Sequence, residues 1–375
     1  MTGRDLPPRW RLPRRDLYIL PLIALLTLLV MSGGAELIAR AAYPVQMDIS
    51  CTLHTTRGTR FRPMCVGLNK AVDGPWVENR FNACGYRTAE NCAVTPATRL
   101  RVAVVGSSIA RGQGVAYADT FSARASADLS HACGQTVDFQ NLGNTAADLL
   151  RLDKRMAEVV AIKSRVVIML LTPYDLQHLD DVDILVPGAH LPKPKPFGLV
   201  DVMGMLRSSH LFDVGQHYLY LDPAIQVTAF VRNGVDDMNG YVVAPLPPKW
   251  KSRVEQIDAL LKKMTAVTTP AGIKVVLVYV PRRVHAVLEI PRYAIAKLDV
   301  HILDRELQAA AHANGAEFID TTPNFAAARN FNSLFYIADG HPSGDGHALI
   351  AKAVEARLLQ MPTFQSCHGT TLAAR

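Results

Sequence analysis

The chain has 375 residues, of which 49% are hydrophobic and 19% charged, and this composition excludes a disordered or low-complexity protein. Its formal charge of +7 comes from 40 Lys and Arg against 33 Asp and Glu. Five arginines and only two aspartates lie in residues 1–16, so this basic tail carries three of the seven positive charges. The rest of the excess forms no basic stripe, which argues against a nucleic-acid partner.

A long apolar segment follows the basic tail. Residues 17–35 (LYILPLIALLTLLVMSGGA) contain no charged side chain, and a helix of that length extends about 28 Å, close to the roughly 30 Å hydrocarbon core of a bilayer. Because arginines precede it, we expect a cytoplasmic N-terminus and a body in the periplasm or outside the cell. We predict a transmembrane signal-anchor helix over residues 17–43, ended by Pro44. A cleaved signal peptide is the alternative, since residues 39–41 (ARA) resemble a cleavage site, but the arginine there is unfavourable.

Six cysteines fit an oxidising compartment. No CxxC or HxxxH spacing accompanies them, which argues against a zinc site. We expect disulfides, and pairing across two short loops is one of 15 possible connectivities. That pairing would join Cys51 to Cys65 and Cys84 to Cys92, and leave Cys133 and Cys367.

The chain beyond the apolar segment divides into an extension, one large domain and a tail. Residues 44–98 are rich in Cys, Arg, Asn and Gly, and are expected to form an irregular extension. Over residues 99–361, short apolar runs alternate with segments of helical periodicity, which predicts a three-layer α/β/α domain with a parallel sheet. A C-terminal tail is expected at 362–375. The runs predicted to be strands are 101–105, 136–140, 166–171, 273–280 and 317–320.

One stretch interrupts this alternation. Residues 176–249 have few strand signals and contain two Pro-rich runs, at 191–197 (LPKPKPF) and 245–248. The stretch is too long for a plain connection. We interpret it as a lid-like insertion over the catalytic end of the sheet, with a surface excursion that has no substrate role as the alternative.

The first candidate functional motif follows the first strand of the domain. Gly106 permits a sharp turn at the end of a buried strand, and Ser108 then lies at the mouth of the sheet, near the start of the next helix. A phosphate-binding loop is the alternative, but neither a GxGxxG pattern nor a P-loop lysine is present.

The second motif precedes the last predicted helix. Asp339 and His341 are two residues apart in an extended segment, so their side chains project to the same side and the carboxylate can orient the imidazole. A histidine held in this way can take a proton from a serine and return it to a leaving group. The alternative is a metal site made by these two residues with Asp345 and His347, although the set has no recognised ligand spacing.

Together these segments resemble the SGNH hydrolase superfamily of GDSL-type esterases and lipases, and especially its membrane-anchored bacterial members. The resemblance covers residues 82–359, and it implies an SGNH hydrolase fold with a flavodoxin-like parallel sheet. It also implies that Ser108 is the nucleophile, His341 the general base and Asp339 the residue that orients it. The matching segments are NACGYR at 82–87, GSS at 106–108, GQGV at 112–115, TF at 120–121 and DGHP at 339–342.

The sequence departs from the family pattern around the oxyanion hole. The family supplies the backbone N–H of the nucleophile, here Ser108, together with a glycine N–H and an asparagine side chain. Ala146 stands at the glycine position and Tyr174 at the asparagine position, and Asn144 is a stand-in donor. Ser107 replaces the aspartate of the GDS block. Loss of one oxyanion donor typically lowers the rate by about 10²–10³-fold, so these changes bear directly on activity.

The resemblance implies a serine esterase that needs no metal or cofactor and hydrolyses a carboxylic ester through an acyl-serine intermediate. The expected substrate is an acylated small molecule or an envelope glycan that carries acetyl groups. The expected location is a bacterial inner membrane, with residues 17–43 as the anchor. Two alternatives remain open: an O-acyltransferase that modifies a cell-envelope polysaccharide, and a catalytically silent carbohydrate-binding or scaffold protein that keeps the fold.

Overall fold

The computed structural model describes residues 13–47, 49–55, 58–93, 100–144, 146–179, 209–232 and 239–369. The side chains of residues 49, 146–148, 366, 368 and 369 are outside this description. The predicted insertion is therefore described only at 176–179, 209–232 and 239–249, and its first Pro-rich run at 191–197 lies outside the described residues.

The centre of the molecule is a five-stranded parallel sheet, which confirms the predicted fold class. Its strand order is β6-β5-β7-β8-β9, the order of flavodoxin-like sheets. β5 lies between β6 and β7, so the crevice expected where the strand order reverses opens at the end of β5. The strands are β5 (Leu100–Gly106), β6 (Val137–Asn141), β7 (Val166–Leu171), β8 (Lys274–Tyr279) and β9 (Glu317–Asp320).

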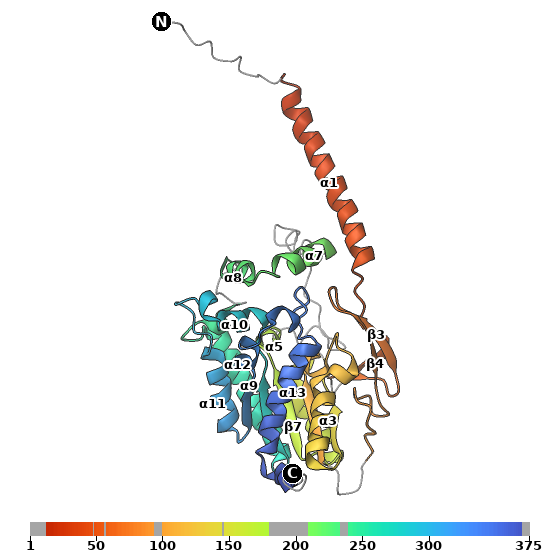
Figure 1. The fold of residues 1–375 in the computed structure, drawn as a ribbon, viewed down its shortest axis with the longest axis vertical. Helices are drawn as coiled ribbons and strands as arrows, with labels where there is room; N and C mark the ends of the chain where they lie inside the picture. The colour runs from red at the N-terminus through yellow and green to blue at the C-terminus, as the bar shows by residue number, and fades with distance from the viewer. Residues whose placement is uncertain are drawn as a thin grey trace.

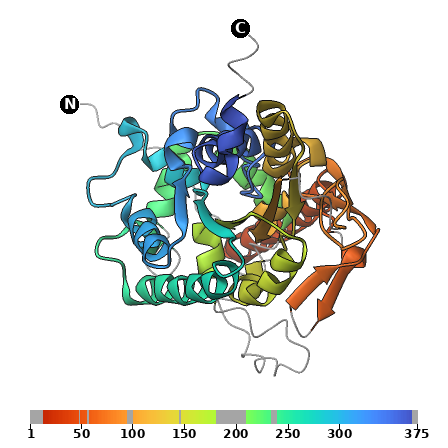
Figure 2. The ribbon, with the colours of Figure 1, turned by 90° about the horizontal axis from the view of Figure 1, so that it is seen from below.

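Helices cover both faces of the sheet (Figures 1 and 2). α3 (Phe121–Cys133) and α13 (Gly344–Leu359) pack on one face, and α9 (Pro248–Thr268) and α11 (Ile302–Ala313) on the other. Alternate residues of β5 enter the two cores: Val104 packs with α3 and α13, whereas Val105 packs with α9. Both faces of β5 are therefore buried under helices, which explains why its sequence is a continuous apolar run. One face of α9 is apolar and packs on the sheet: Val254, Ile257, Leu260, Leu261 and Met264 are all buried.

The extension at 44–98 is not irregular, contrary to the prediction. It forms two antiparallel hairpins, β1 (Thr52–Thr55) with β2 (Gly58–Phe61), and β3 (Val66–Lys70) with β4 (Trp76–Arg80). β3 and β4 alternate buried and exposed residues, but the buried positions include glycine and asparagine, so the period-2 pattern is hidden in the sequence. Short strands of this kind gain stability from covalent closure, and disulfides join Cys51 to Cys65 and Cys84 to Cys92.

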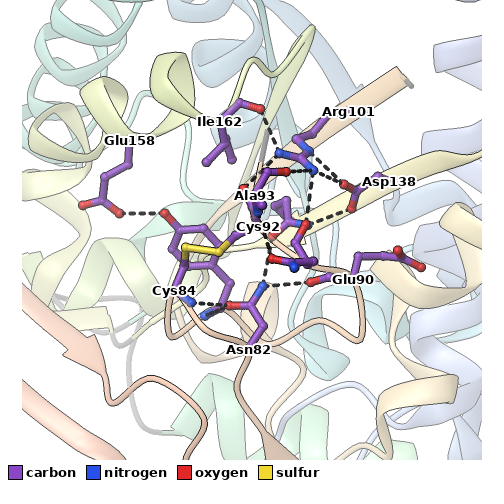
Figure 3. Close-up of a disulfide and its surroundings, with 12 residues drawn as sticks. Asn82, Cys84, Glu90, Cys92, Ala93, Arg101, Asp138, Glu158 and Ile162 are labelled. Atoms are coloured by element: carbon purple, nitrogen blue, oxygen red, sulfur yellow. Dashed lines mark hydrogen bonds and ion pairs between the residues drawn. A yellow bond between two sulfur atoms is a disulfide. The ribbon is translucent and has the colours of Figure 1, made fainter. Parts of the chain in front are cut away.

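The second disulfide loop is fixed to the sheet by a buried ion pair (Figure 3). The guanidinium of Arg101 on β5 lies 2.7 Å from the carboxylate of Asp138 on β6, and both side chains are almost fully buried. The same guanidinium donates hydrogen bonds to backbone carbonyls of Asn91, Cys92 and Ala93. Because each charge and most donors have partners, the arginine joins the extension to the first two strands of the sheet.

The C-terminal boundary at residue 361 is also wrong. A 3₁₀ helix, η8 (Pro362–Gly369), continues from α13 and packs against α3 and α13. Phe364 on this helix is fully buried in the core, and Cys367 forms a disulfide with Cys133 at the end of α3. The domain therefore extends at least to Cys367. With this third bond, all six cysteines are paired in the connectivity that local pairing predicts.

The apolar N-terminal segment is a helix, α1 (Asp16–Ala42), and it extends away from the domain (Figure 1). Among the described residues it is the one helix that is long and apolar enough to cross a membrane. Of two helices in the insertion, α7 (His210–Leu219) lies beside the end of α1, and α8 (Pro223–Arg232) lies over α10 (Arg283–Leu288) (Figure 1). The insertion thus occupies the same end of the molecule as the N-terminal helix.

Candidate active site

The turn after β5 presents Ser108 at the carboxyl edge of the sheet. Gly106 has φ +138°, and a Cβ there would lie 2.8 Å from the backbone oxygen of Leu170 on the neighbouring strand. Only glycine fits this position, because other residues would be strained and would clash. The chain then begins the short helix α2 (Ser108–Arg111), so the hydroxyl of Ser108 faces the crevice.

The structure brings Ser108, His341 and Asp339 together. Ser108 Oγ lies 2.7 Å from His341 Nε2, and His341 Nδ1 lies 2.5 Å from Asp339 Oδ2. A carboxylate can only accept a hydrogen bond, so Nδ1 carries the proton and Nε2 is left to accept from the serine hydroxyl. Burial raises the pKa of Asp339, but the charge and hydrogen bonds of His341 outweigh it and the net effect lowers the pKa. Asp339 is therefore ionised at neutral pH.

A residue of the extension holds the loop that carries this pair. Asp73, in the turn between β3 and β4, accepts hydrogen bonds from the backbone N–H groups of Ala338 at 2.8 Å and Asp339 at 3.3 Å. Its carboxylate also lies 3.0 Å from Nδ1 of His217 on α7, and its side chain is only 4% exposed. Asp73 thus links the extension, the insertion and the loop of residues 338–341, which we call the catalytic-type loop. No local sequence signal distinguishes it, since its partners lie far away in the chain.

The extension also supports the other side of the crevice. Arg87 is 1% exposed and donates hydrogen bonds to the carbonyls of Arg111, Gly112 and Val115. These carbonyls belong to the turn that follows α2, so the arginine fixes the backbone just beyond Ser108. The NACGYR segment at 82–87, part of the resemblance to the SGNH superfamily, therefore supports the backbone next to Ser108.

Asp175 is a buried acid at the crevice, and it is not among the predicted site residues. It stands three residues after Thr172, and the two residues form a reciprocal capping box at the start of α5 (Pro173–Gln177). Burial raises the pKa of Asp175 to about 6, although a hydrogen bond from Ser107 opposes the shift. The T-x-x-D spacing directly after a buried strand was the signal that could have revealed this capping residue.

The three predicted oxyanion residues other than Ser108 occupy different places. Tyr174 lines the crevice and is 45% exposed, with its ring 4.1 Å from that of His178. Asn144 is buried, does not line the crevice, and donates its side-chain N–H to the carbonyl of Thr59. Its proposed role as a stand-in donor is therefore not supported. Ala146 begins η3 (Ala146–Arg155), and its side chain lies outside the described residues.

The alternative metal set is not assembled. His347 is fully buried, and its Nδ1 accepts a hydrogen bond from the backbone of Phe121 on α3. Burial lowers the pKa of His347 to about 3, so the ring is neutral. Asp345 is exposed. Within the described parts of the chain, the one group of acidic and histidine side chains close enough to share an ion is elsewhere, at His301, Asp304 and Asp320.

The crevice is a cleft of about 370 Å³, and the insertion forms part of its wall. Gln216 and Tyr220 from α7 and Gln226 from α8 line it together with Ser108 and His341. Next to α8, Arg282 and Arg283 contribute guanidinium groups to the lining, and burial lowers the pKa of Arg283 to about 10. The cleft therefore combines a serine hydroxyl and an imidazole with amide and guanidinium side chains.

These features define a parallel α/β protein with a Ser–His–Asp constellation at the carboxyl edge of its sheet. No family model matches the chain, and no curated protein sequence matches it. It is similar to solved structures of an α/β hydrolase from the metagenome of Lake Arreo, Spain, and of the lipase/acylhydrolase from Enterococcus faecalis. The first has 14% identity over 71% of this chain and 96% of the other, with a TM-score of 0.39. The second has 14% identity over 69% and 96%, with a TM-score of 0.36.

A member of the lipolytic protein G-D-S-L family from Veillonella parvula is similar at 14% identity over 70% of this chain and all of the other, with a TM-score of 0.36. At these values the likeness identifies neither an activity nor a substrate of this chain. The functional interpretation therefore depends on the topology and the geometry of its own residues.

Proposed function

We propose that the protein is an SGNH-type serine esterase that hydrolyses a carboxylic ester. The observation that carries the proposal is the continuous chain of contacts from Ser108 Oγ through His341 to Asp339. Two parts of the fold, the turn after β5 and the loop before α13, converge to make these contacts at the strand edge where α/β enzymes bind their substrates. If these three partly exposed residues had only a structural role, the Ser108 hydroxyl would not need to point at an imidazole nitrogen of His341.

The reaction follows from the proton positions. Ser108 Oγ attacks the acyl carbonyl while Nε2 of His341 takes the hydroxyl proton, and the resulting imidazolium is stabilised by Asp339. The imidazolium then protonates the departing alcohol, which leaves an acyl-serine. A water molecule, deprotonated by the same nitrogen, releases the free acid and restores the serine. The N–H groups of Ser108 and Ala146 are the donors proposed for the oxyanion, with the Tyr174 hydroxyl as a further donor at the rim.

The proposed substrate is an acylated small molecule or an acetylated envelope glycan. Its support is the lining of the cleft, where Gln113, Gln216 and Arg282 offer donors to hydroxyl or carbonyl groups. The proposed location is a bacterial inner membrane, with residues 17–43 as a retained anchor and the domain outside the cytoplasm. The apolar α1, the basic tail before it and the three disulfides support this location.

The test compares the full-length protein with its Ser108→Ala variant, both in detergent micelles, using 4-nitrophenyl acetate and a fluorophosphonate probe. We expect hydrolysis and labelling by the parent, and a loss of kcat by about 10³-fold or more in the variant. Ser252→Ala, which removes an exposed hydroxyl from α9, is the matched control and should retain full activity. Unchanged hydrolysis by Ser108→Ala would reject the proposal, and no labelling of folded parent protein would favour a silent binding module.

An O-acyltransferase is the second candidate, because α7 and α8 contribute to the wall of the cleft and are placed to limit the access of water to an acyl-serine. Product analysis with an acetyl donor and a polysaccharide acceptor separates the two reactions. Acetylated acceptor supports transfer, whereas free acetate alone supports hydrolysis.

A further inference from the structure

The helices α7 and α8 present an apolar surface on the side of the molecule nearest to the N-terminal helix. Within residues 209–232 the exposed large hydrophobic side chains range from 39% to 58% accessible. We call this set the outer lid face. Its members are Leu211, Phe212, Tyr218, Leu219, Leu221, Ile225 and Val231. Such a concentration of exposed aliphatic and aromatic side chains marks a binding surface rather than ordinary solvent-facing polarity.

The spacing on α7 places this face beside the residues that line the cleft. At 100° per residue, Leu211, Phe212 and Leu219 fall within about a third of the helix circumference. Gln216 and Tyr220 lie on the flank beyond Phe212, about 40° and 80° further around the helix, and line the cleft. On α8, Val227 and Phe230 are buried against the domain. The two helices therefore form a layer with the cleft beneath it and apolar side chains above.

Direct contacts fix the position of this layer relative to α1. The carboxylate of Glu36 accepts hydrogen bonds from Ser209 Oγ at 2.6 Å and from the backbone N–H groups of His210 and Leu211 at 3.1 and 2.9 Å. Tyr43 and Tyr218 join their hydroxyls at 3.1 Å near the other end of α7. Glu36 is the first charged residue after the apolar run of residues 17–35. The first turn of α7 is thus held where the membrane-spanning segment would leave the hydrocarbon core.

We propose that the outer lid face docks onto the surface of the bilayer that holds α1, so that the cleft serves esters carried by lipid-anchored molecules. This inference rests on the proposed anchor and esterase function. A helix placed at the end of a membrane span lies at the headgroup level, where apolar and tyrosine side chains are stabilised. Residues 209–232 include one arginine and no lysine, so attraction to anionic lipids contributes little and apolar burial supplies the affinity.

The layer is also connected to the catalytic-type loop. His217 of α7 contacts Asp73, whose carboxylate holds the backbone of Ala338 and Asp339. On α8, Gln226 accepts a hydrogen bond from Arg283 at the wall of the cleft. A lid docked on the bilayer is therefore supported from below by the site residues, and the cleft lies directly under the lipid surface.

The first experiment measures contact with lipid and needs no enzyme activity. Full-length Leu219→Trp and Val267→Trp variants are reconstituted in phosphatidylcholine vesicles with and without brominated acyl chains, and the parent emission is subtracted. Leu219 and Val267 are 55% and 43% exposed, but Val267 is near the end of α9 that leads to the opposite edge of the sheet. We expect bromine to remove roughly half or more of the emission added at 219, and little of that added at 267. Equal and weak quenching at both positions would overturn the proposal. It would also be overturned if a second copy of the chain covers residue 219 and shields its tryptophan from the lipid.

The second experiment measures the substrate class. Aryl acetate free in solution and aryl acetate tethered through its aryl group to a phosphatidylethanolamine headgroup are hydrolysed by the reconstituted parent, Leu219→Asp and Val267→Asp. We expect Leu219→Asp to lower the rate on the tethered ester roughly tenfold, because apolar burial is replaced by a charge at the lipid surface, and to leave the soluble ester unaffected. Equal rates of parent and Leu219→Asp on the tethered ester would overturn the proposed substrate class. Absence of hydrolysis of both esters would instead reject the esterase function, while the quenching result would still decide the docking.

Discussion

The N-terminal extension and the α7–α8 insertion both lie outside the parallel sheet and both reach the candidate site, but they do so by different physical means. The extension meets the domain through buried charged side chains: Arg87 of the extension is 1% exposed and binds carbonyls, and Arg101 of β5 is 2% exposed and binds a carboxylate and carbonyls of the extension. The insertion exposes apolar side chains such as Tyr218 and Leu219 to the surroundings. Buried ion pairs that are fully hydrogen-bonded specify one geometry. Apolar helices over a cleft exclude water and adapt to a surface.

This difference assigns the two regions separate tasks. The extension fixes the backbone of the loops that carry Ser108 and Asp339, and it is closed by disulfides. The insertion adds Gln216, Tyr220 and Gln226 to the wall of the cleft. Changes in the extension should therefore affect folding and the positions of the reacting groups. Changes on the outer face of the insertion should affect only which substrates reach them.

The largest expected effect concerns the Asp339 carboxylate, which contacts the imidazole of His341. Asp339→Asn should lower kcat for 4-nitrophenyl acetate by about 10³–10⁴-fold, because an amide no longer favours the Nδ1–H tautomer of His341 or stabilises the imidazolium. The free energy of unfolding should change little. Steady-state kinetics and guanidinium denaturation in detergent test both statements, and a decrease of only a few-fold would show that Asp339 does not orient the base.

The next effect tests the buried ion pair of Arg101 and Asp138, which holds the extension on the sheet. Arg101→Met should lower the free energy of unfolding by about 3–5 kcal/mol, because it leaves Asp138 as a buried and unpaired charge. The double variant Arg101→Met, Asp138→Leu should recover much of this loss. On the insertion, Leu219→Asp should change the stability by less than about 0.5 kcal/mol. Equal losses of unfolding free energy in Arg101→Met and Leu219→Asp would contradict the difference between the buried contacts of the extension and the exposed face of the insertion.

The acid beneath the cleft gives a pH-dependent effect of intermediate size. The pKa of Asp175 is raised from 3.8 to about 6 by burial, so the native state holds its proton more tightly than the unfolded state. The stabilisation that comes from this bound proton is fully present below about pH 4 and is lost as the pH rises through 6. The free energy of unfolding therefore decreases by about 3 kcal/mol over this range. Asp175→Asn should abolish this part of the pH slope, whereas Asp345→Asn, which changes an exposed side chain, should keep it. An unchanged slope in Asp175→Asn would contradict the burial effect.

Much of the sheet could be predicted from the sequence because buried parallel strands are written as continuous apolar runs. The five predicted strands and the helix faces required no long-range information, and the order β6-β5-β7-β8-β9 follows from the family resemblance. Ser108, His341 and Asp339 were found for a related reason: each follows from local features, a glycine turn and an i, i+2 spacing, at loops that flank the sheet. The expected disulfides in the extension were also local.

The remaining features depend on contacts between distant segments. The hairpins of the extension were missed because glycine and asparagine occupy buried strand positions. The helix η8 was missed because its contacts, which include the disulfide and the burial of Phe364, join it to distant segments. Asp73 has partners 144 to 266 residues away, and no local pattern encodes such pairings. Asn144 was assigned to the site from its place in a motif, but its amide is used by the backbone of Thr59.

The smallest effect tests Asp73, through which the extension contacts both α7 and the loop that carries Asp339. Asp73→Asn keeps the size of the side chain but removes one of the carboxylate oxygens that hold Ala338, Asp339 and His217. We expect kcat to fall about tenfold, equivalent to about 1.4 kcal/mol, with KM for the small ester unchanged, since Asp73 positions the loop and does not line the cleft. Glu78→Gln, an exposed acidic residue on β4, is the control and should retain the parent kcat. If the lid acts through Asp73, His217→Phe should lower kcat less in the Asp73→Asn background than in the parent, whereas strictly additive effects would show that the lid and the catalytic-type loop are independent.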